Sequence, residues 1–412
     1  MLIHRHAIRQ VRELMAMYPL VLVDGPPRCG KSTLARQLSA SSSAGAILAR
    51  AGSPDGRRII ANPQRLSSAQ PVILDGATMD EASILASILA LPSPDNTTAR
   101  LPRFVLIGGP FRQFHTPEAR SGRSHPDAAR SDTVRFDAVN PTIAHPILGQ
   151  LSLGPLTLAE VGRGSVRAHW LRGGYPEAYT ADSDSAAMTT LGGLIAGMSG
   201  GLLSPWGLPA SPTRLATLLT CLAETERASV NENNLARILG ISRPTICRWM
   251  DSLEQAGILH RIPRIRGKGG VRRTVQAPAW FLRDSGLIHG LLGIRSNADL
   301  RSMPRLAAAS WRAYVLEQTA SVIGRGTELG SYLSADGACI ELVLTKGNRI
   351  LAAVTRAHLP GSPGKGANLA AQAVGASDRR IVVPDETSRN MGGGFKATGL
   401  ATFLDEIRTI FG

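Results

Sequence analysis

Apolar and polar positions alternate between helical and strand-like patterns in the N-terminal quarter of the chain. In residues 6–17, apolar side chains recur at intervals of three and four, which predicts an amphipathic helix. Continuous apolar runs follow at 18–24, 71–75 and 103–108, and each is typical of a buried parallel strand. A further helix is predicted at 33–39. Because strands alternate with helices, the pattern indicates an α/β sheet.

The C-terminal quarter shows a second pattern of this kind. A helix is predicted at 306–323, strands at 339–344 and 349–355, and a glycine-rich loop at 360–366. We interpret this end as a separate small α/β domain. Residues 113–132 are rich in Pro, Ser, His and Arg without periodicity, which predicts a long exposed loop.

Between these parts, residues 231–259 form two short helical patterns joined by a tight turn. Gly240 is suited to the turn, Ser242 to the cap of the second helix and Pro244 to its first turn. The pattern is typical of a helix-turn-helix and predicts a winged-helix module. Such modules bind DNA or serve as lids between domains, and both readings stay open. The basic residues that DNA would meet are Arg243 and Arg248 in the second helix and Arg264, Arg266, Lys268, Arg272 and Arg273 in the wing.

Composition adds limits to this picture. The chain has 412 residues, of which 43% are apolar, so it can bury a core in two or three domains and is not disordered or fibrous. A net charge of +15, almost all from arginine, fits either a polyanionic partner or a bias in codon usage. Four dispersed cysteines predict neither a disulfide scaffold nor a zinc ribbon. No signal peptide is evident, and glycines and prolines interrupt the uncharged stretch 185–213, so we expect a cytoplasmic protein without a membrane partner.

Residues 25–32 carry the clearest chemistry. Their sequence, GPPRCGKS, fits the phosphate-binding pattern GxxxxGK[ST] and lies between a predicted strand and a predicted helix. Backbone N–H groups of such a loop and the positive end of the helix bind phosphates, while Lys31 can reach the β- and γ-phosphates and Ser32 can hold Mg²⁺. The predicted nucleotide-binding residues are Gly25, Pro26, Arg28, Gly30, Lys31, Ser32 and Thr33.

Residues that would drive hydrolysis are less evident. Asp75 ends the second apolar run and is placed to bind Mg²⁺ together with Ser32. In many active ATPases a glutamate follows this aspartate and polarises the attacking water, but this chain has Gly76. Asp80 and Glu81 either substitute for it or form the polar first turn of a helix. The third run ends in two glycines at 108–109, without a hydroxyl or amide, so no catalytic residue is assigned.

The chain resembles AAA-type ATP-binding proteins of bacteria and archaea whose C-terminal half is a domain of unknown function of the 4143 type. Beyond the phosphate loop, the resemblance rests on 151–160 (like PLS-x-x-E), 171–178 (like GGYPE), 235–259 (like the winged helix) and 278–287 (like PK-x-x-x-x-D-x-GL). It implies an ATP-binding domain at 1–180, a helical and winged-helix module at 181–290, and at 291–412 an α/β domain similar to PD-(D/E)xK nucleases.

Several departures mark the chain as a degenerate member of that family. At 75–78 the family usually has Asp-Glu-Ile-Gln, whereas this chain has DGAT. At 108–109 the family usually has Gly-Ser, whereas this chain has two glycines. At 149–150 the family often has Gly-Arg, whereas this chain has Gln150 in place of the arginine. In the nuclease-like domain, the expected acidic and lysine positions hold Arg312, Glu341 and the run Ala353-Val-Thr355, of which only Glu341 is acidic. A single carboxylate binds a catalytic Mg²⁺ poorly, so nuclease activity is not expected.

Together these observations predict an α/β protein: a P-loop NTPase parallel sheet, then an all-α winged-helix module, then a nuclease-like α/β domain. The predicted function is that of an ATP-binding AAA-type switch that uses ATP and Mg²⁺ with weak hydrolysis. The alternative is a DNA-binding winged-helix regulator with a vestigial P-loop domain. The partners considered are a nucleotide, DNA and a second copy of the chain in a homo-oligomer.

Overall fold

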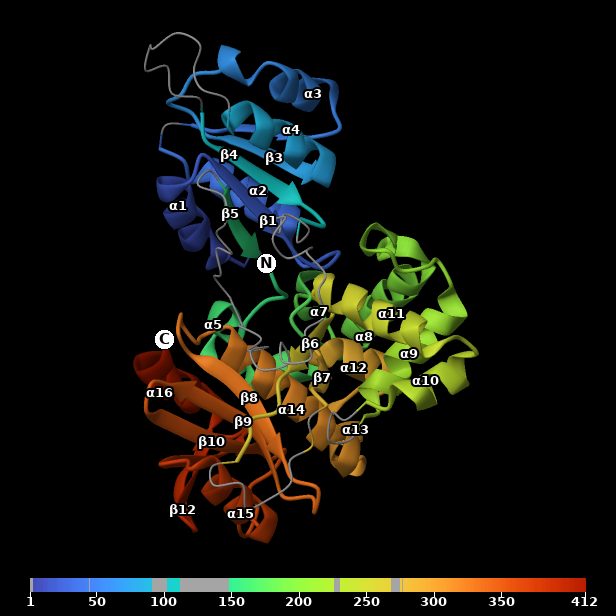
Figure 1. Ribbon diagram of the computed structural model, residues 1–412, viewed down its shortest axis with the longest axis vertical. Helices are drawn as coiled ribbons and strands as arrows, with labels where there is room; N and C mark the ends of the chain where they lie inside the picture. Colours follow the sequence, from blue (N-terminus) through green and yellow to red (C-terminus); the bar gives the residue numbers. More distant parts are fainter. Residues whose placement is uncertain are drawn as a thin grey trace, which may run out of the picture. The chain divides into compact units, whose positions relative to one another are not determined.

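The computed structural model describes residues 3–43, 45–90, 102–111, 148–225, 230–267, 275 and 277–412 (Figure 1). The chain divides into two compact units that part between Pro155 and Leu156. This division falls inside the predicted first domain, 1–180, and the three-part division stays a prediction. The expected loop at 113–132 lies outside the described residues.

The first unit is built on a five-stranded sheet in which every pairing is parallel, in the order β2-β3-β4-β1-β5. The parallel α/β fold expected from the three apolar runs is therefore confirmed for this unit. Its strands are β1 (Leu20–Asp24), β2 (Ile47–Arg50), β3 (Val72–Ala77), β4 (Phe104–Gly108) and β5 (Leu148–Ser152). Its α-helices are α1 (Ala7–Met17), α2 (Lys31–Ala40), α3 (Pro54–Ala61) and α4 (Met79–Ala90).

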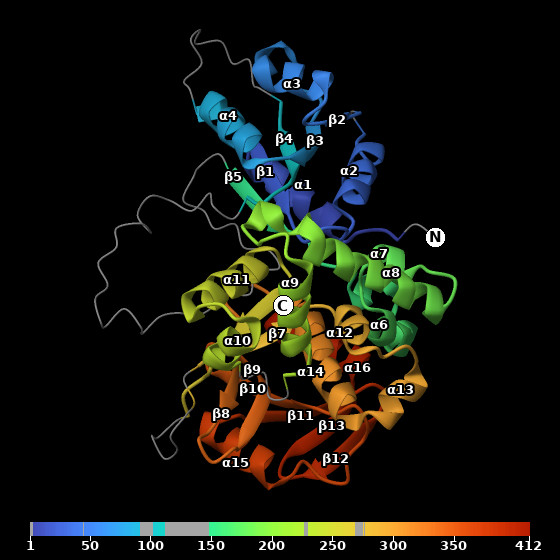
Figure 2. The same ribbon diagram turned by 90° about the vertical axis from the view of Figure 1, so that its right-hand side faces the viewer.

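Helices cover both faces of this sheet. α1 contacts α2 on one face, and α3 contacts α4 on the other; Figure 2 shows α2 and α4 on opposite sides of the strands. Successive side chains of a strand point to opposite faces, so Leu20 and Leu22 pack with Ile60 of α3 and Leu85 of α4 in one core. Because both faces are covered, all five residues of β1 are buried.

The second unit begins with a mostly helical part. Buried polar groups connect its helices: Asp284 accepts hydrogen bonds from the N–H groups of Gly174 (2.7 Å) and Leu287 (2.9 Å). Burial raises the pKa of Asp284 to about 6. The α-helices are α5 (Leu158–Val161), α6 (Val166–Arg172), α7 (Pro176–Tyr179), α8 (Asp184–Gly197), α9 (Pro212–Ala223), α10 (Glu232–Leu239), α11 (Arg243–Gln255), α12 (Ser285–Leu292), α13 (Asn297–Ser302) and α14 (Pro304–Ala320).

Two segments that carried the family resemblance meet at Asp284. Gly173 ends α6 with a φ of 73°, and a Cβ there would lie 2.3 Å from Asp284 Oδ1. A Cβ on Gly286 would lie 2.3 Å from the Arg172 carbonyl oxygen. Glycine at both positions allows α6 and α12 to approach each other at this contact. The GGYPE-like and D-x-GL-like segments are therefore two sides of one packing contact.

The helix-turn-helix pattern forms as the local signals predict. α10 ends at Gly240 in the left-handed conformation (φ 64°), Ser242 accepts the N–H of Thr245 at the start of α11, and Pro244 lies in the first turn. The module is not all-α, however. β6 (Leu259–Ile262) and β7 (Ala279–Leu282) pair antiparallel after α11, because their apolar side chains are buried there. The all-α assignment was wrong in this respect.

A six-stranded mixed sheet completes the second unit, in the order β12-β13-β11-β10-β9-β8. α15 covers one face through a core that includes Ile340, Val354 and Ile381. α14 and α16 contact each other and the strands β10, β11 and β13. The elements are β8 (Glu328–Leu333), β9 (Cys339–Lys346), β10 (Arg349–Thr355), α15 (Lys365–Val374), β11 (Asp378–Val383), β12 (Ser388–Gly392), β13 (Phe395–Gly399) and α16 (Leu400–Phe411).

The glycine contact at Asp284 gives a stability prediction. Gly173→Ala should lower the free energy of unfolding by about 2–4 kcal/mol, because a positive φ and a crowded site both penalise a side chain. Gly192→Ala is the matched control: Gly192 lies inside α8 with no atom within 4 Å of its would-be Cβ, so it should gain about 1 kcal/mol. Chemical denaturation measures both. Equal stabilities of the two variants would contradict the packing account.

Candidate functional site

The loop of residues 25–30 joins the carboxyl end of β1 to the amino end of α2. Gly25 has a φ of 152°, and a Cβ there would lie 2.1 Å from the carbonyl oxygen of Leu153. Gly30 caps α2 with a φ of 99°, and exposed Arg28 has a φ of 65°. The loop therefore has a compact backbone that L side chains adopt rarely. It leads directly into a helix of ten residues, whose free N–H groups form an anion-binding end.

The side chain of Lys31 folds back onto this loop. Its ammonium donates hydrogen bonds of 2.8 Å to the carbonyl oxygens of Gly25 and Pro26. Lys31 and Thr33 are half-buried, while Ser32 is exposed in the first turn of α2. The predicted nucleotide-binding residues thus lie in one continuous loop and helix start. A phosphate bound there would accept hydrogen bonds from the same ammonium, because its three donors can be shared.

Asp75 lies at the same edge of the sheet as the start of the phosphate loop. On β3 it pairs with Ile107 of β4, and Ile107 pairs with Val23 of β1, one residue before the end of that strand. The half-buried Asp75 carboxylate is thus at the carboxyl edge of the sheet, which is where the phosphate loop begins. Among the described residues, no group of three or more His, Cys, Asp or Glu side chains is placed to hold a metal ion. Binding of Mg²⁺ by Ser32 and Asp75 would therefore need phosphate and water oxygens as further ligands.

The two acidic residues that follow Asp75 belong to the start of α4. Glu81 Oε2 accepts a hydrogen bond from the Thr78 N–H at 2.7 Å and another from the Thr78 hydroxyl. The bond from the Thr78 N–H to the glutamate is one half of a helix capping box, and it places the Glu81 side chain at the first turn of α4. Asp80 is exposed in the same turn. The structure therefore favours the helix-start reading of Glu81 over a catalytic one.

The glycines near the site leave no side chain to orient a water. Gly76 lies at a bulge of β3 with a φ of 75°. A Cβ on Gly108 would lie 2.0 Å from the carbonyl oxygen of Ala77, so this position admits glycine alone without rearrangement. Gly109 has a φ of 115°, and its Cβ would lie 3.2 Å from Asp24 Cβ. These positions are therefore constrained to glycine by backbone geometry as well as lacking a polar group.

Gln150 occupies the position at which the resembling family often has an arginine. Its Nε2 donates a 3.2 Å hydrogen bond to Oδ2 of Asp24, a buried carboxylate directly before Gly25. Gln150 is therefore engaged within its own unit, on the strand next to β1. This contact gives it a local role and supports no reading as a residue that reaches another subunit.

Arg5 is a supporting residue that the sequence patterns did not reveal. Only 3% of its surface is exposed, and its Nη1 donates a 2.7 Å hydrogen bond to the carbonyl oxygen of Cys29 inside the loop. Its Nη2 donates to the carbonyl oxygens of Gly154 (2.9 Å) and Pro155 (3.4 Å). Arg5 thus fixes the loop against the chain that follows β5. No signal in the sequence marks it, because its partners lie up to 150 residues away.

Two buried histidines of the second unit are structural groups. His169 Nδ1 lies 2.8 Å from the Tyr314 hydroxyl, and His289 Nδ1 donates a 2.8 Å hydrogen bond to the Leu171 carbonyl oxygen. Both side chains are fully buried, and burial lowers the pKa of each to about 4. They are therefore neutral near pH 7 and satisfied by local partners, which is the usual state of a core histidine.

The residues predicted to meet DNA are only partly available. Arg243 is exposed but donates a 2.9 Å hydrogen bond from Nε to Glu232, and Arg248 is exposed on the same helix. Arg264 is half-buried and donates to Ser331 of β8, whereas Arg266 is exposed. The other predicted wing residues, Lys268, Arg272 and Arg273, lie outside the described residues. In the described part of the chain, no helix has the length and apolar character needed to cross a bilayer.

Comparison with known families gives one match. A family described as a domain of unknown function (DUF8612) matches residues 163–298, about a third of the chain, and this span includes the contact between Gly173 and Asp284. The resemblance to the 4143-type family stays a prediction beside this match.

Two curated relatives are uncharacterized mycobacterial proteins, Rv2008c of Mycobacterium tuberculosis and Mb2031c of Mycobacterium bovis. Each is 27% identical over 320 residues, which is 77% of this chain and 66% of the relative. The chain therefore spans slightly less than two thirds of the length of these relatives.

Two solved structures with similarity are, by title, a Walker-type ATPase and a branch migration motor. The Walker-type ATPase PABY2304 of Pyrococcus abyssi shares 14% identity over 71% of this chain and 96% of its own, with a TM-score of 0.43. The RuvB Holliday junction branch migration motor of Thermotoga maritima shares 16% identity over 63% and 90%, with a TM-score of 0.27. At these scores the likeness does not establish a common fold, and the site geometry carries the functional argument.

Lys31 gives the direct test of the loop. Lys31→Ala should remove most ATP affinity, because its ammonium lies against the loop that is expected to bind the phosphates. Titration with a fluorescent ATP analogue measures the affinity of parent and variant. Lys346→Ala is the control, since Lys346 lies in the other unit and bonds to the C-terminal carbonyl. If Lys31→Ala bound ATP as tightly as the parent, the site assignment would be wrong.

Arg5 should also change the affinity for ATP, although it does not contact the nucleotide. Arg5→Met deprives the buried carbonyl of Cys29 and the part-buried carbonyl of Gly154 of this donor, at a cost of about 1–3 kcal/mol for the buried group. The loop then loses its fixed geometry, so ATP affinity should fall about tenfold or more. Arg5→Lys restores a charge with a single nitrogen and should be intermediate. Arg9→Met, at an exposed residue of α1 paired with Glu13, is the control. A folded Arg5→Met protein with unchanged affinity would refute the positioning role.

Proposed function

We propose that this chain is an ATP-binding P-loop NTPase of AAA type, in the cytoplasm, that binds ATP with Mg²⁺ and hydrolyses it slowly. The observation that carries the proposal is the loop after β1, whose left-handed residues, helix start and folded Lys31 ammonium converge on one anion-binding place. Phosphates bound there would be held by Gly25, Gly30, Lys31 and Thr33, with Mg²⁺ at Ser32 and Asp75.

Slow hydrolysis follows from what surrounds the loop. A general base typically contributes 10²–10⁴-fold to a rate, and the position after Asp75 is glycine. Glu81 is engaged in capping α4 through Thr78, and Gly108 has no room for a polar side chain. Among the described residues, the site therefore keeps its binding groups and contains no group placed to activate and orient water.

A nucleotide-gated switch fits the connections of the loop. Arg5 bonds at once to the loop, through Cys29, and to Gly154 and Pro155, which precede the second unit in the chain. A nucleotide that draws Lys31 away from the carbonyls of Gly25 and Pro26 changes the hydrogen bonding of the same loop. Nucleotide binding can thereby be transmitted through Arg5 to the chain segment between the units.

The alternative is a DNA-binding winged-helix regulator, and the arrangement of α10, α11, β6 and β7 favours it. The balance of positive and negative charges on this module favours DNA binding less. Arg243 is paired with Glu232, and Arg261 forms ion pairs with Asp251 and, at 2.8 Å, with Glu254. The negative charges of Asp251 and Glu254 on α11 would repel phosphates and so offset part of the attraction of the arginines. We therefore place the module as a lid or interdomain element first and as a DNA reader second.

One set of measurements separates these functions. ATP binding and phosphate release are measured in the same samples, with and without duplex DNA and at several salt concentrations. We expect ATP to bind. Turnover should lie on the order of 10²–10⁴-fold below the 1–10³ s⁻¹ of typical enzymes, because the described residues supply neither a base nor a water-orienting group. The alternative would be supported by DNA binding whose logarithmic affinity falls against the logarithm of the salt concentration, with a slope of about 0.9 per phosphate contact.

Variants at α4 check the missing base. Asp80→Asn and Glu81→Gln should leave the residual turnover unchanged, since neither group acts on water. Gly76→Glu has open space around its Cβ but must overcome a left-handed φ, at about 1–2 kcal/mol, before its carboxylate can restore turnover. A fast parent protein whose turnover is abolished by Asp80→Asn or Glu81→Gln would show that the base had moved.

A further inference from the structure

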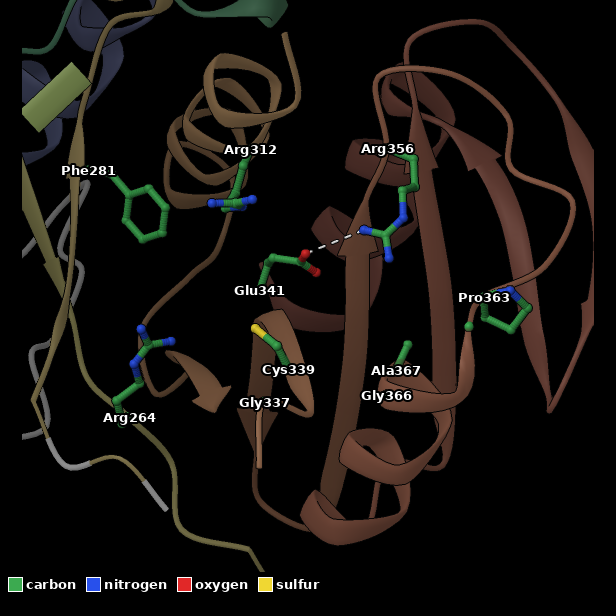
Figure 3. A pocket seen from close by; sticks show the side chains of 11 residues that line it. Arg264, Phe281, Arg312, Gly337, Cys339, Glu341, Arg356, Pro363, Gly366 and Ala367 are labelled. Atoms are coloured by element: carbon green, nitrogen blue, oxygen red, sulfur yellow. Dashed lines mark hydrogen bonds and ion pairs between the residues drawn. The ribbon is translucent and has the colours of Figure 1, made fainter. Parts of the chain in front are cut away.

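The second unit contains a cavity of about 280 Å³ whose charged lining is mostly arginine. The guanidinium groups of Arg264, Arg312 and Arg356 come from three sides toward Glu341, the one acidic residue among those that line it (Figure 3). They originate from the segment after β6, from α14 and from the end of β10. This cavity is separate from the phosphate loop, which belongs to the first unit.

Local contacts hold the arginines in place. Arg264 Nη1 donates a 3.1 Å hydrogen bond to Ser331 Oγ, and the neighbouring Ile265 N–H donates to the Ser331 carbonyl oxygen at 2.8 Å. Arg356 Nη1 donates to the Thr355 carbonyl oxygen at 2.7 Å and to Glu341 Oε1 at 3.3 Å. The guanidinium groups of Arg264 and Arg356 are thus pre-organised, so little of their side-chain entropy would be lost when they bind a ligand.

The cavity carries an excess of positive charge. Its lining residues hold three guanidinium groups and one carboxylate, which leaves a formal charge of +2. Burial lowers the pKa of Arg264; Cys339 acts against this shift, and the nearby Arg312 adds to it. Like charges gathered in a half-enclosed space repel each other, and a bound anion would offset that repulsion.

The start of α15 adds a second attraction for anions. Gly364, Gly366 and Ala367 line the cavity, and they belong to the cap and first turn of this ten-residue helix. The first turn contains no acidic residue. Its N–H groups, which lack partners within the helix, therefore present a partial positive charge to the same space.

We propose that this cavity binds a terminal phosphate, a phosphomonoester, without a metal ion. A phosphomonoester carries a charge of about −1.5 to −2 at pH 7, which matches the +2 of the lining, whereas a phosphodiester carries only −1. Planar guanidinium groups are suited to bidentate phosphate binding. A divalent cation would meet three guanidinium groups and a single carboxylate. The ligand is thus either a small phosphorylated metabolite or the phosphorylated end of a nucleic-acid strand.

The test uses the full chain carrying Lys31→Ala, so that the phosphate loop contributes little, with EDTA present. The probes are inorganic phosphate, ribose 5-phosphate, and one single-stranded oligonucleotide in 5′-phosphorylated and 5′-hydroxyl forms. We expect phosphorylated probes to bind. Arg312→Gln should weaken binding about tenfold to hundredfold, the usual effect of losing a hydrogen bond to a charged group. Arg349→Gln, at an exposed residue of the same sheet, should change nothing.

Glu341→Gln distinguishes an anion site from a cation site. It raises the formal charge of the lining to +3, so phosphate binding should stay equal or tighten, whereas a metal site would lose a ligand. Should Arg312→Gln fail to fold by circular dichroism, Arg264→Gln takes its place. Tight binding of ribose 5-phosphate with weak binding of the phosphorylated strand assigns a small metabolite, and the reverse assigns a strand end.

Three outcomes would overturn the proposal. The first is that none of the phosphorylated probes binds. The second is binding that requires Mg²⁺ or is lost in Glu341→Gln, which would indicate a cation site. The third is equal binding of the 5′-hydroxyl and 5′-phosphorylated strands, which would indicate a surface for phosphodiesters. Each result is independent of ATP binding at the other unit, because ATP affinity is measured separately in the chain that retains Lys31.

Discussion

The close approach of Gly25 to the carbonyl oxygen of Leu153 sets the geometry on which the nucleotide site depends. A Cβ at residue 25 would lie 2.1 Å from that oxygen, so β1 can turn into the loop only where no side chain is present. The buried Arg5 guanidinium then fixes the loop through Cys29 and the following chain through Gly154. Because the loop is held at these points, its N–H groups and the start of α2 face one place before any ligand arrives.

The parts of this site that depend on contiguous residues could be predicted from the sequence. The loop of 25–32 and the cap at Ser242 are local patterns whose geometry is fixed within a few residues. Arg5 could not be found in this way, because its partner at Gly154 is 149 residues distant. The short strands β2 and β5 were also missed, since their sequences lack the apolar runs of the central strands.

The cavity lined by Arg264, Arg312 and Arg356 shows the same limit of prediction from local sequence patterns in the second unit. The sequence predicted that Arg312 and Glu341 occupy positions of a nuclease-like site, and it predicted a domain without catalysis. It did not show that Arg264, from the predicted wing, lies beside β8 and lines the same cavity. Part of the positive charge therefore lines a cavity, so the net charge of +15 does not by itself indicate a surface that binds DNA. If both proposals hold, the two units present two different anion-binding places, one built from backbone and one from guanidinium groups.

The central claim is that the first unit holds ATP and converts it slowly. The most direct measurement incubates the protein with Mg²⁺ and ATP, separates it from free nucleotide by rapid gel filtration, and identifies the bound nucleotide by chromatography over time. The account predicts about one nucleotide per chain that remains ATP for many minutes. Absence of bound nucleotide, or bound nucleotide that is already ADP at the earliest time, would contradict it.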